Sequence, residues 1–255
     1  MYAEERQQAI ADLVTQRGRL SVAELADRFT VTTETVRRDL SLLERAGVVR
    51  RVHGGAVPSK ALAVLELAVN ERDISHSEQK DQVATAALAF LPSGGGSVLL
   101  DAGTTTARLA ALLPLEHTFT VYTNAVPIAG RLASRANVEL HLLPGRVRRT
   151  TQAAVGVDTV NALEELRTDV AFIGTNGLSA AHGLSTPDPS EAAAKRAMIA
   201  SARQVVVLAD SSKIGAESTI RFGELDQIDV LVTDSGISDA DRDALTALDI
   251  KVVIA

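Results

Sequence analysis

The chain of 255 residues contains no cysteine, and aromatic residues make up only 3% of it. Without thiols, we expect no disulfide, no thiolate metal site and no cysteine nucleophile. No run of about 18 apolar residues occurs, and residues 1–6 contain no apolar signal core, so we expect neither a membrane span nor export. The sequence therefore favours a cytoplasmic protein that needs no bound cofactor and no metal.

Hydrophobic residues still make up 46% of the chain, so a sizeable core must be built mainly from Ala, Val, Leu and Ile. The net charge of −6 is unevenly distributed: residues 1–58 hold nine arginines against eight acidic residues. This part is therefore +1, and the remaining residues are −7 because −6 minus +1 is −7. Five of the arginines lie between residues 37 and 51. Such a local cluster is typical of nucleic-acid binding, so the overall acidity does not exclude DNA as a partner.

Residues 4–30 predict two short helices. Ile10 and Val14 lie at helical spacing in an amphipathic segment that extends from about residue 4 to residue 16. Ser21, followed three residues later by Glu24, forms a capping box that begins the second helix. A turn at residues 30–31 then gives the spacing of a helix-turn-helix motif.

The third helix is expected between about residues 32 and 47. Thr32 or Thr33 can cap its N-terminus, and Gly47 supplies a stop. Val36 and Leu40 belong to its apolar stripe, so the opposite face is available to enter the major groove. The residues of this helix that we expect to contact DNA are Thr33, Glu34, Thr35, Arg37, Arg38 and Ser41.

Residues 48–58 predict a β-wing. A short strand over residues 48–52 carries Arg50 and Arg51, and His53 precedes two glycines that suit a tight turn. The two arginines can hold the flanking phosphates, and we assign His53 to the same surface. Residues 1–58 are thus expected to form a winged helix-turn-helix domain. The alternatives are a helical hairpin with a solvated run of charge and a winged domain that binds protein.

Residues 77–255 alternate between short aliphatic strands and amphipathic helices. They follow a linker at residues 59–76, which has room for a short helix and which we expect to couple the two domains. The expected strands cover residues 97–101, 119–123, 138–142, 169–173, 204–209, 229–233 and 251–254. The expected helices cover residues 77–91, 105–113, 127–134, 157–166, 191–203 and 239–248. This alternation predicts an α/β fold whose mostly parallel sheet is covered on both faces.

Polar residues follow several of these strands, where open α/β sheets bind ligands. Asp101–Thr106 reads Asp-Ala-Gly-Thr-Thr-Thr and opens a helix, so its amides and hydroxyls can cradle a phosphate. An ordinary loop with a threonine N-cap is the competing interpretation. The candidate effector-binding residues are Asp101, Gly103, Thr104, Thr105, Thr106, Thr123, Asn124, Arg148, Gly174, Thr175, Asn176, Gly177 and Lys213. Glu191 and Lys195, one turn apart, read as a surface ion pair.

Residues 33–40, Thr-Glu-Thr-Val-Arg-Arg-Asp-Leu, followed by residues 51–56, Arg-Val-His-Gly-Gly-Ala, resemble the N-terminal signature of the DeoR family of bacterial transcriptional regulators. The resemblance implies a C-terminal sensor domain similar in fold to ribose-5-phosphate isomerase and CoA transferases. It also implies a homodimeric or homotetrameric repressor that leaves its operator DNA when a phosphorylated sugar binds. Residues matching 101–106, 174–177 and Lys213 line the pocket in such domains.

The form of the N-terminus and of residues 31–35 further resembles members linked to fructose uptake, which makes fructose 1-phosphate the first candidate effector. Galactose-type or tagatose-type phosphates and glycerol 3-phosphate stay open as effectors.

A sugar-phosphate isomerase is the enzyme alternative, but residues 170–177 lack the clustered acids of those enzymes. The five histidines show no ligand spacing, which disfavours a metal-dependent regulator.

Overall fold

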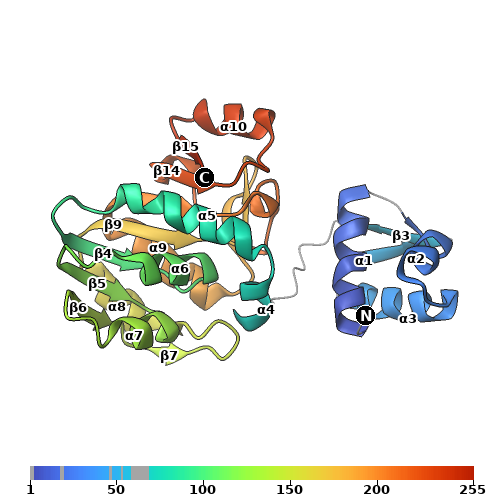
Figure 1. The fold of residues 1–255 in the computed structure, drawn as a ribbon, viewed down its shortest axis with the longest axis horizontal. Coiled ribbons are helices and arrows are strands. Elements are labelled where there is room, and N and C mark those ends of the chain that lie inside the picture. Colours follow the sequence, from blue (N-terminus) through green and yellow to red (C-terminus); the bar gives the residue numbers. More distant parts are fainter. Residues whose placement is uncertain (1–2, 18–19, 46–47, 53, 59–68) are drawn as a thin grey trace. The chain divides into compact units, whose positions relative to one another are not determined.

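The computed structural model describes residues 3–17, 20–45, 48–52, 54–58 and 69–255. The chain divides into two compact units, Met1–Glu66 and Leu67–Ala255, and Figure 1 shows the elements of each. Within the described part of the chain, no helix is both long enough and apolar enough to cross a membrane.

The first unit is a winged helix-turn-helix, as the sequence predicts. Its helices are α1 (Ala3–Arg17), α2 (Val22–Phe29) and α3 (Thr33–Arg45). Its antiparallel strands are β1 (Leu20–Ser21), β2 (Val49–Val52) and β3 (Gly55–Pro58), in the order β1-β3-β2. The wing also pairs with the segment before α2, where Leu20 lies opposite Ala56.

Helix caps fix the two helices of the motif. The Glu24 amide donates to Ser21 Oγ over 3.1 Å, and the Ser21 amide donates to the Glu24 carboxylate over 2.7 Å, so the predicted capping box forms. Thr32, rather than Thr33, caps α3 through a 3.2 Å bond from the Thr35 amide. Val36 and Leu40 are fully buried in the core of this unit. The predicted apolar stripe therefore faces inward.

The second unit contains a seven-stranded, fully parallel sheet in the order β15-β14-β12-β9-β4-β5-β6. Its strands are β4 (Gly96–Leu100), β5 (Phe119–Thr123), β6 (Val138–Leu142), β9 (Thr168–Gly174), β12 (Ala202–Leu208), β14 (Val230–Thr233) and β15 (Lys251–Ile254). Each predicted strand is confirmed to within two residues. The expected α/β class is therefore also confirmed.

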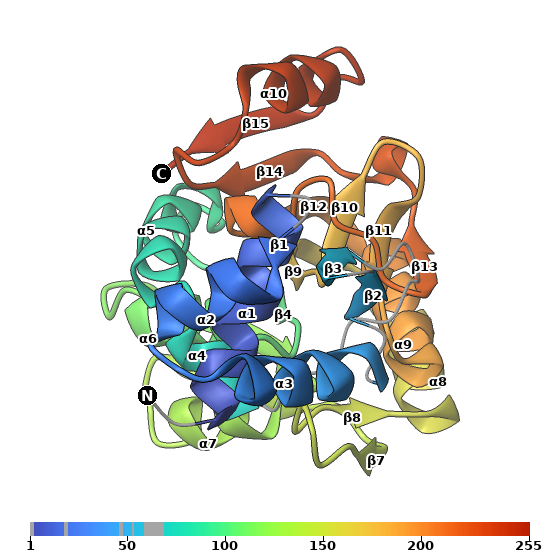
Figure 2. The same ribbon diagram turned by 90° about the vertical axis from the view of Figure 1, so that its right-hand side faces the viewer.

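Helices cover both faces of this sheet (Figure 1). One layer consists of α5 (Ser77–Ala87), α6 (Thr104–Leu112) and α7 (Val126–Leu132). The other consists of α8 (Val157–Glu164), α9 (Pro189–Ala200) and α10 (Asp239–Thr246), and α10 packs against β15 at one edge of the sheet (Figure 2). Successive residues of a strand point to opposite faces, so Leu100 and Leu99 belong to different cores.

Two features were not predicted from the sequence. A small antiparallel sheet in the order β10-β11-β13 is formed by Gly177–Ser179, Gly183–Thr186 and Ile220–Gly223. A hairpin joins β7 (Arg146–Val147) to β8 (Ala154–Val155).

The short helix that the linker was expected to allow is α4 (Val69–Ile74), which packs against α6. The expected linker ran to residue 76, whereas these contacts place α4 within the second unit; we therefore propose the boundary after residue 66.

The order of the strands creates a crevice for a ligand. β4 pairs with β5 on one side and with β9 on the other, so the chain leaves the carboxyl ends of β4 and β9 at neighbouring positions. Ligands of open α/β sheets bind at such a point. The loop before α6 and the loop after β9 therefore meet at one edge of the sheet.

Candidate functional site

The outward face of α3 presents the predicted DNA-contacting side chains. Thr33, Glu34, Arg37 and Arg38 are exposed, and Thr35 and Ser41 are half-buried. The Arg37 guanidinium lies 3.4 Å from the Glu34 carboxylate, with 56% and 82% of the two side chains exposed. Such an exposed ion pair contributes little, so DNA can replace it at small cost. The Ser41 hydroxyl donates to the Arg37 carbonyl over 2.7 Å and is thereby turned along the helix.

Asp39, which the sequence analysis left without a role, holds α3 in its orientation. The carboxylate is 3% exposed and accepts a 2.7 Å bond from Arg6 Nε of α1. Gln7 Nε2 donates to the same carboxylate over 2.9 Å. Hydrogen bonding to Asp39 raises the pKa of Arg6, which keeps the buried arginine charged. This anchor lies on the face of α3 opposite its arginines.

The wing carries the remaining DNA candidates. Arg50 and Arg51 lie in β2, opposite Val57 and Ala56 of β3. Their side chains, and His53 altogether, lie outside the described residues. Their contact with DNA stays a prediction.

In the second unit, two adjoining cavities open where β4 and β9 end. The smaller has a volume of about 60 Å³ and the larger about 530 Å³. Arg72, Gly103 and Thr104 line both. The two cavities thus share part of their walls, and one is narrow while the other is wide.

The smaller cavity is lined by cationic and small polar groups. Its charged residues are Arg72, Lys80, Lys213 and Asp210. Its other polar residues are Ser75, Thr104, Thr105, Thr106 and Thr175, and its lining also includes Gly103 and Gly174. Three cations against one carboxylate make this compartment electropositive, as an anion requires.

Lys80 is the most buried of these cations, with 5% of its surface exposed. It donates to the carbonyls of Arg72 and Ser75. The pKa of Lys80 is lowered to about 8: burial is the largest cause, Asp210 acts against it, and the neighbouring Lys213, Arg108 and Arg72 add to the lowering. The sequence offered a signal for this residue, because Lys80 lies on the apolar stripe of α5 with Val83, Ala84 and Ala87.

The start of α6 forms another wall of the smaller cavity. Gly103 is the N-cap and brings no side chain to the helix end. No threonine caps this helix, and the phosphate cradle stays a prediction. The first amides of a helix have no acceptor within it and attract anions. The Thr106 hydroxyl does not face the cavity, because it donates to the carbonyls of Asp101 and Gly103 over 2.7 and 2.9 Å.

The larger cavity combines apolar and polar walls. Ala107, Ala111, Leu112, Pro127 and Ile128 form an apolar side between α6 and α7. Thr85, Thr104 and Thr151 offer hydroxyls, and Asp73, Asp81, Arg108 and Arg131 add charges. The compartment suits a small organic group that carries hydroxyls.

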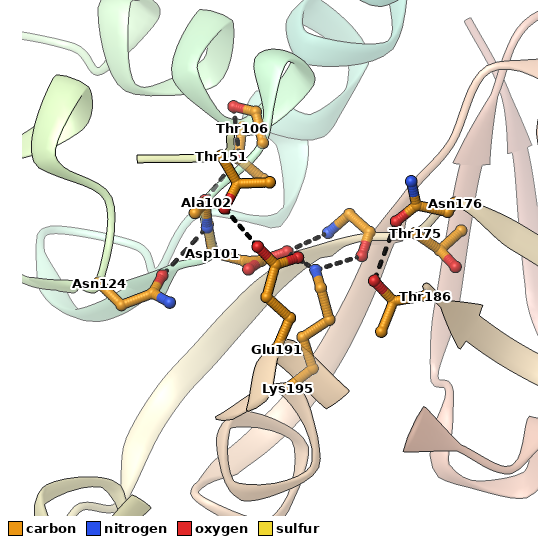
Figure 3. A network of polar contacts seen from close by, with 12 residues as sticks. Asp101, Ala102, Thr106, Asn124, Thr151, Thr175, Asn176, Thr186, Glu191 and Lys195 are labelled. Carbon is orange, nitrogen blue, oxygen red and sulfur yellow. Dashed lines mark hydrogen bonds and ion pairs between the residues drawn. The ribbon is translucent and has the colours of Figure 1, made fainter. Parts of the chain in front are cut away.

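A buried ionic network lies behind these cavities (Figure 3). Lys195 donates to the carboxylate of Asp101 and, over 2.8 Å, to the carbonyl of Gly174, whose amide donates to Asp101 over 3.0 Å. Asp101 is 1% exposed and Lys195 5%. The network ties α9 to the ends of β4 and β9, so Asp101 lies behind the cavity walls and lines neither cavity.

The interpretation of Glu191 and Lys195 as a surface pair is wrong. Glu191 is 5% exposed and is paired with Arg148, and the Thr151 hydroxyl donates to the same carboxylate. Arg148 also lies 3.2 Å from Asp188, so it joins the hairpin tip to α9 and lines neither cavity. Spacing along the helix could not reveal partners that lie 40 or more residues away.

Four further candidate residues lie outside the cavity linings and contact the segments around them. Asn124 accepts a 3.1 Å bond from the Ala102 amide and donates to Ala154, and Thr123 donates to the Leu100 carbonyl over 2.7 Å. Asn176 accepts a 3.1 Å bond from Thr186, and Gly177 begins β10. None of these four lines either cavity. Of the sequence candidates, the cavities bring together Gly103, Thr104, Thr105, Thr106, Gly174, Thr175 and Lys213.

Solved structures that the chain resembles include ribose 5-phosphate isomerase A from Neisseria gonorrhoeae. The match has a TM-score of 0.38 and 15% identity, and covers 55% of this chain and 54% of that one. The eIF2B beta subunit of Chaetomium thermophilum matches with a TM-score of 0.41 and 15% identity, over 61% and 48% of the two chains. Likeness at this level has no bearing on function.

Family models match both units. Residues 6–61 match the DeoR-like helix-turn-helix domain, and residues 75–235 match the DeoR C terminal sensor domain. Similar curated proteins include the HTH-type transcriptional regulator GlpR of Haloferax volcanii, which is 35% identical over 99% of this chain and 98% of its own. The lactose phosphotransferase system repressor of Streptococcus mutans is 34% identical over 92% and 93%. The glycerol-3-phosphate regulon repressor of Escherichia coli is 28% identical over 91% and 90%. The chain belongs to the DeoR family of DNA-binding transcriptional regulators.

Proposed function

We propose that the chain is a repressor of a sugar uptake or catabolic operon, released from its operator when a phosphorylated sugar fills the two adjoining cavities. The observation that carries this proposal is the electropositive smaller cavity, in which Arg72, Lys80 and Lys213 face the N-terminus of α6. A phosphate dianion suits that compartment, and the hydroxylated remainder of the ligand suits the larger one. The names of two relatives, which refer to a lactose phosphotransferase system and to glycerol 3-phosphate, support this class of effector.

The experiment that tests this function is fluorescence anisotropy on DNA from upstream of the gene and its neighbouring operon. It is run at fixed salt, because phosphate contacts make affinity depend on salt. Fructose 1-phosphate is the first compound to add, followed by galactose-type and tagatose-type phosphates and glycerol 3-phosphate. Release by one compound supports the proposal and names the effector. Tight binding that none of them alters would reject this ligand class.

The DNA-binding form is proposed to be a homodimer or homotetramer, because paired winged units read two half-sites of an operator. Sedimentation at the concentrations used for DNA binding tests this, and a monomer that binds the full operator would contradict it.

A sugar-phosphate isomerase is the second candidate, since Asp101, Glu191 or Lys213 could serve in a proton transfer. A proton-transfer catalyst needs such a group within reach of the substrate. Here Asp101 is occupied by Lys195, and Glu191 by Arg148 and Thr151. Lys213 lines the smaller cavity, but neither of these two carboxylates lines a cavity, which favours a sensor without catalysis. Turnover of ribose 5-phosphate or of the releasing compound would reverse this preference.

Lys213→Gln is expected to weaken binding of the effector by roughly 10-fold to 100-fold, because a charged hydrogen bond to phosphate contributes about 1.5–3 kcal/mol. Operator affinity should stay unchanged, so that the variant represses but responds poorly. Titration calorimetry measures the first quantity and anisotropy the second. Lys251→Gln, which removes an exposed lysine at the sheet edge, is the matched control. An unaltered effector affinity in Lys213→Gln would remove Lys213 from the site.

Effector affinity is also expected to fall as the pH rises above about 8. The pKa of Lys80 is lowered to about 8, mainly by burial, so the unliganded protein loses this cation above that pH. A phosphate monoester is already a dianion there, since its second pKa is about 6. The dissociation constant should therefore be flat from pH 7 to 8 and then rise by up to about tenfold per pH unit. Lys80→Gln should bind more weakly with a flat profile, and a rise that persists in that variant would assign the titration elsewhere.

A further inference from the structure

At residues 72–75, the described side chains and carbonyls at the end of the short helix α4 are bound to the second unit by ionic and polar bonds. Ile74 is 80% exposed, so this side chain contributes almost no apolar packing. Arg108 of α6 instead pairs with the Asp73 carboxylate and donates to the Asp73 carbonyl over 3.0 Å. Lys80 of α5 donates to the Arg72 and Ser75 carbonyls.

These same anchors are cavity groups. Arg72 lines both compartments, Lys80 lines the smaller one, and Asp73 and Arg108 line the larger one. Arg108 also donates to the Thr104 carbonyl over 3.2 Å, at the wall common to both compartments. Any anion in the site therefore acts directly on the bonds that hold α4.

The charges give this effect a direction. When α4 is docked, Arg72 lies near Lys80 and Lys213, and like charges in one small space oppose docking. A phosphate dianion among the three would give them a common counterion and reverse that opposition. The ligand therefore binds more tightly to the docked helix, and only such a difference in affinity can shift the docking equilibrium.

We infer that α4 is a strap that a phosphate group in the smaller cavity tightens onto α5 and α6. This inference rests on the proposed function. It adds the route by which binding of the ligand is transmitted from the cavity to the rest of the protein. In the sequence, α4 follows directly after residues 59–68, which join the two units. Docking of α4 therefore fixes the point from which the winged unit is tethered, and through it the spacing of two winged units on an operator.

Hydrogen exchange of the full-length protein tests the strap, with inorganic phosphate as the probe and calorimetry as the measure of binding. Saturating phosphate is expected to slow exchange of the amides of residues 70–75 about fivefold or more, the usual lower range of coupling between sites. Asp73→Asn should abolish this slowing, because it removes the pairing with Arg108. Glu78→Gln is the matched control: it removes an exposed carboxylate from α5 that lines neither cavity. The Asp73 side chain is more than half exposed and Glu78 is exposed as well, so neither change endangers folding.

The outcomes separate the strap from the proposed function. Phosphate binding with unchanged exchange in residues 70–75 would overturn the strap and leave the effector site standing. Absence of phosphate binding would remove both. Equal loss of slowing in Asp73→Asn and Glu78→Gln would also overturn the strap, since α4 would then have no special part. Slowing in the wild type and in Glu78→Gln, but not in Asp73→Asn, supports it.

Discussion

Replacing both Arg37 and Arg38 by alanine is expected to weaken operator binding roughly 30-fold or more. Each arginine can donate two bonds to one guanine edge, and such a contact is worth about 1–3 kcal/mol, so two give about 2–6 kcal/mol. Both side chains are exposed on α3, and the ion pair that Arg37 makes with Glu34 is too exposed to compete with DNA. Anisotropy on operator and on scrambled DNA measures the loss.

The pattern of the loss identifies which contacts were made. If the arginines read bases, the preference for operator over scrambled DNA falls; if they hold phosphates, affinity for both falls alike and the salt dependence becomes shallower. Arg203→Ala is the matched control, because it removes an exposed arginine from the second unit. Effector binding should be unaffected in every variant. Operator affinity within twofold of the wild type in the double variant would mean that α3 is not the reading helix.

Local rules of helix and strand formation account for what could be predicted from the sequence. The capping box at Ser21 and Glu24 and the apolar stripe at Val36 and Leu40 depend on neighbours within four residues, and both formed as expected. The strands of the parallel sheet are buried on both faces and read as aliphatic runs, which position them closely. The structure of such segments can therefore be predicted from their local sequence.

The small sheet formed by β10, β11 and β13 could not be predicted, because it depends on contacts between segments that are distant in the sequence. Its strands have only three or four residues, and they are held by neighbours rather than by their own pattern. Gly177 illustrates this, because a Cβ atom at that position would lie 2.4 Å from the Ala216 carbonyl oxygen. A glycine chosen for close approach of two distant segments looks, in sequence, like any glycine of a loop.

The candidate site was predicted only in part, because its cations depend on long-range burial. The sequence located the loop at Gly103 and the residue Lys213 by their places after strands. It gave no role to Arg72, whose position depends on α4 packing against α6, or to Lys80, which is buried on α5. It also assigned Asp101 to the effector, since its partner Lys195 is 94 residues away. A strand end predicts that a polar residue is near the site, but not whether it faces the ligand or supports the wall.

That distinction makes Lys195→Met the most damaging single change that we expect in the second unit. The substitution keeps most of the side-chain volume but leaves the Asp101 carboxylate, which is 1% exposed, without its cation. Breaking a buried pair in this way typically costs about 3–5 kcal/mol. The thermal midpoint of this unit should fall by about 6–20 °C, given about 2–4 °C per kcal/mol for a unit of this size. Thermal unfolding followed by circular dichroism measures it.

A second variant separates lost charge pairing from lost packing. In Asp101→Asn/Lys195→Met, the asparagine can still accept the bond from the Gly174 amide but carries no charge, so much of the lost stability should return. Lys251→Met, at an exposed lysine above the Phe90 ring, should change stability by less than about 1 kcal/mol. If Lys195→Met were as mild as that control, the pair would not be truly desolvated. Recovery in the double variant would show that Asp101 and Lys195 act as one unit that holds the ends of β4 and β9 behind the effector site.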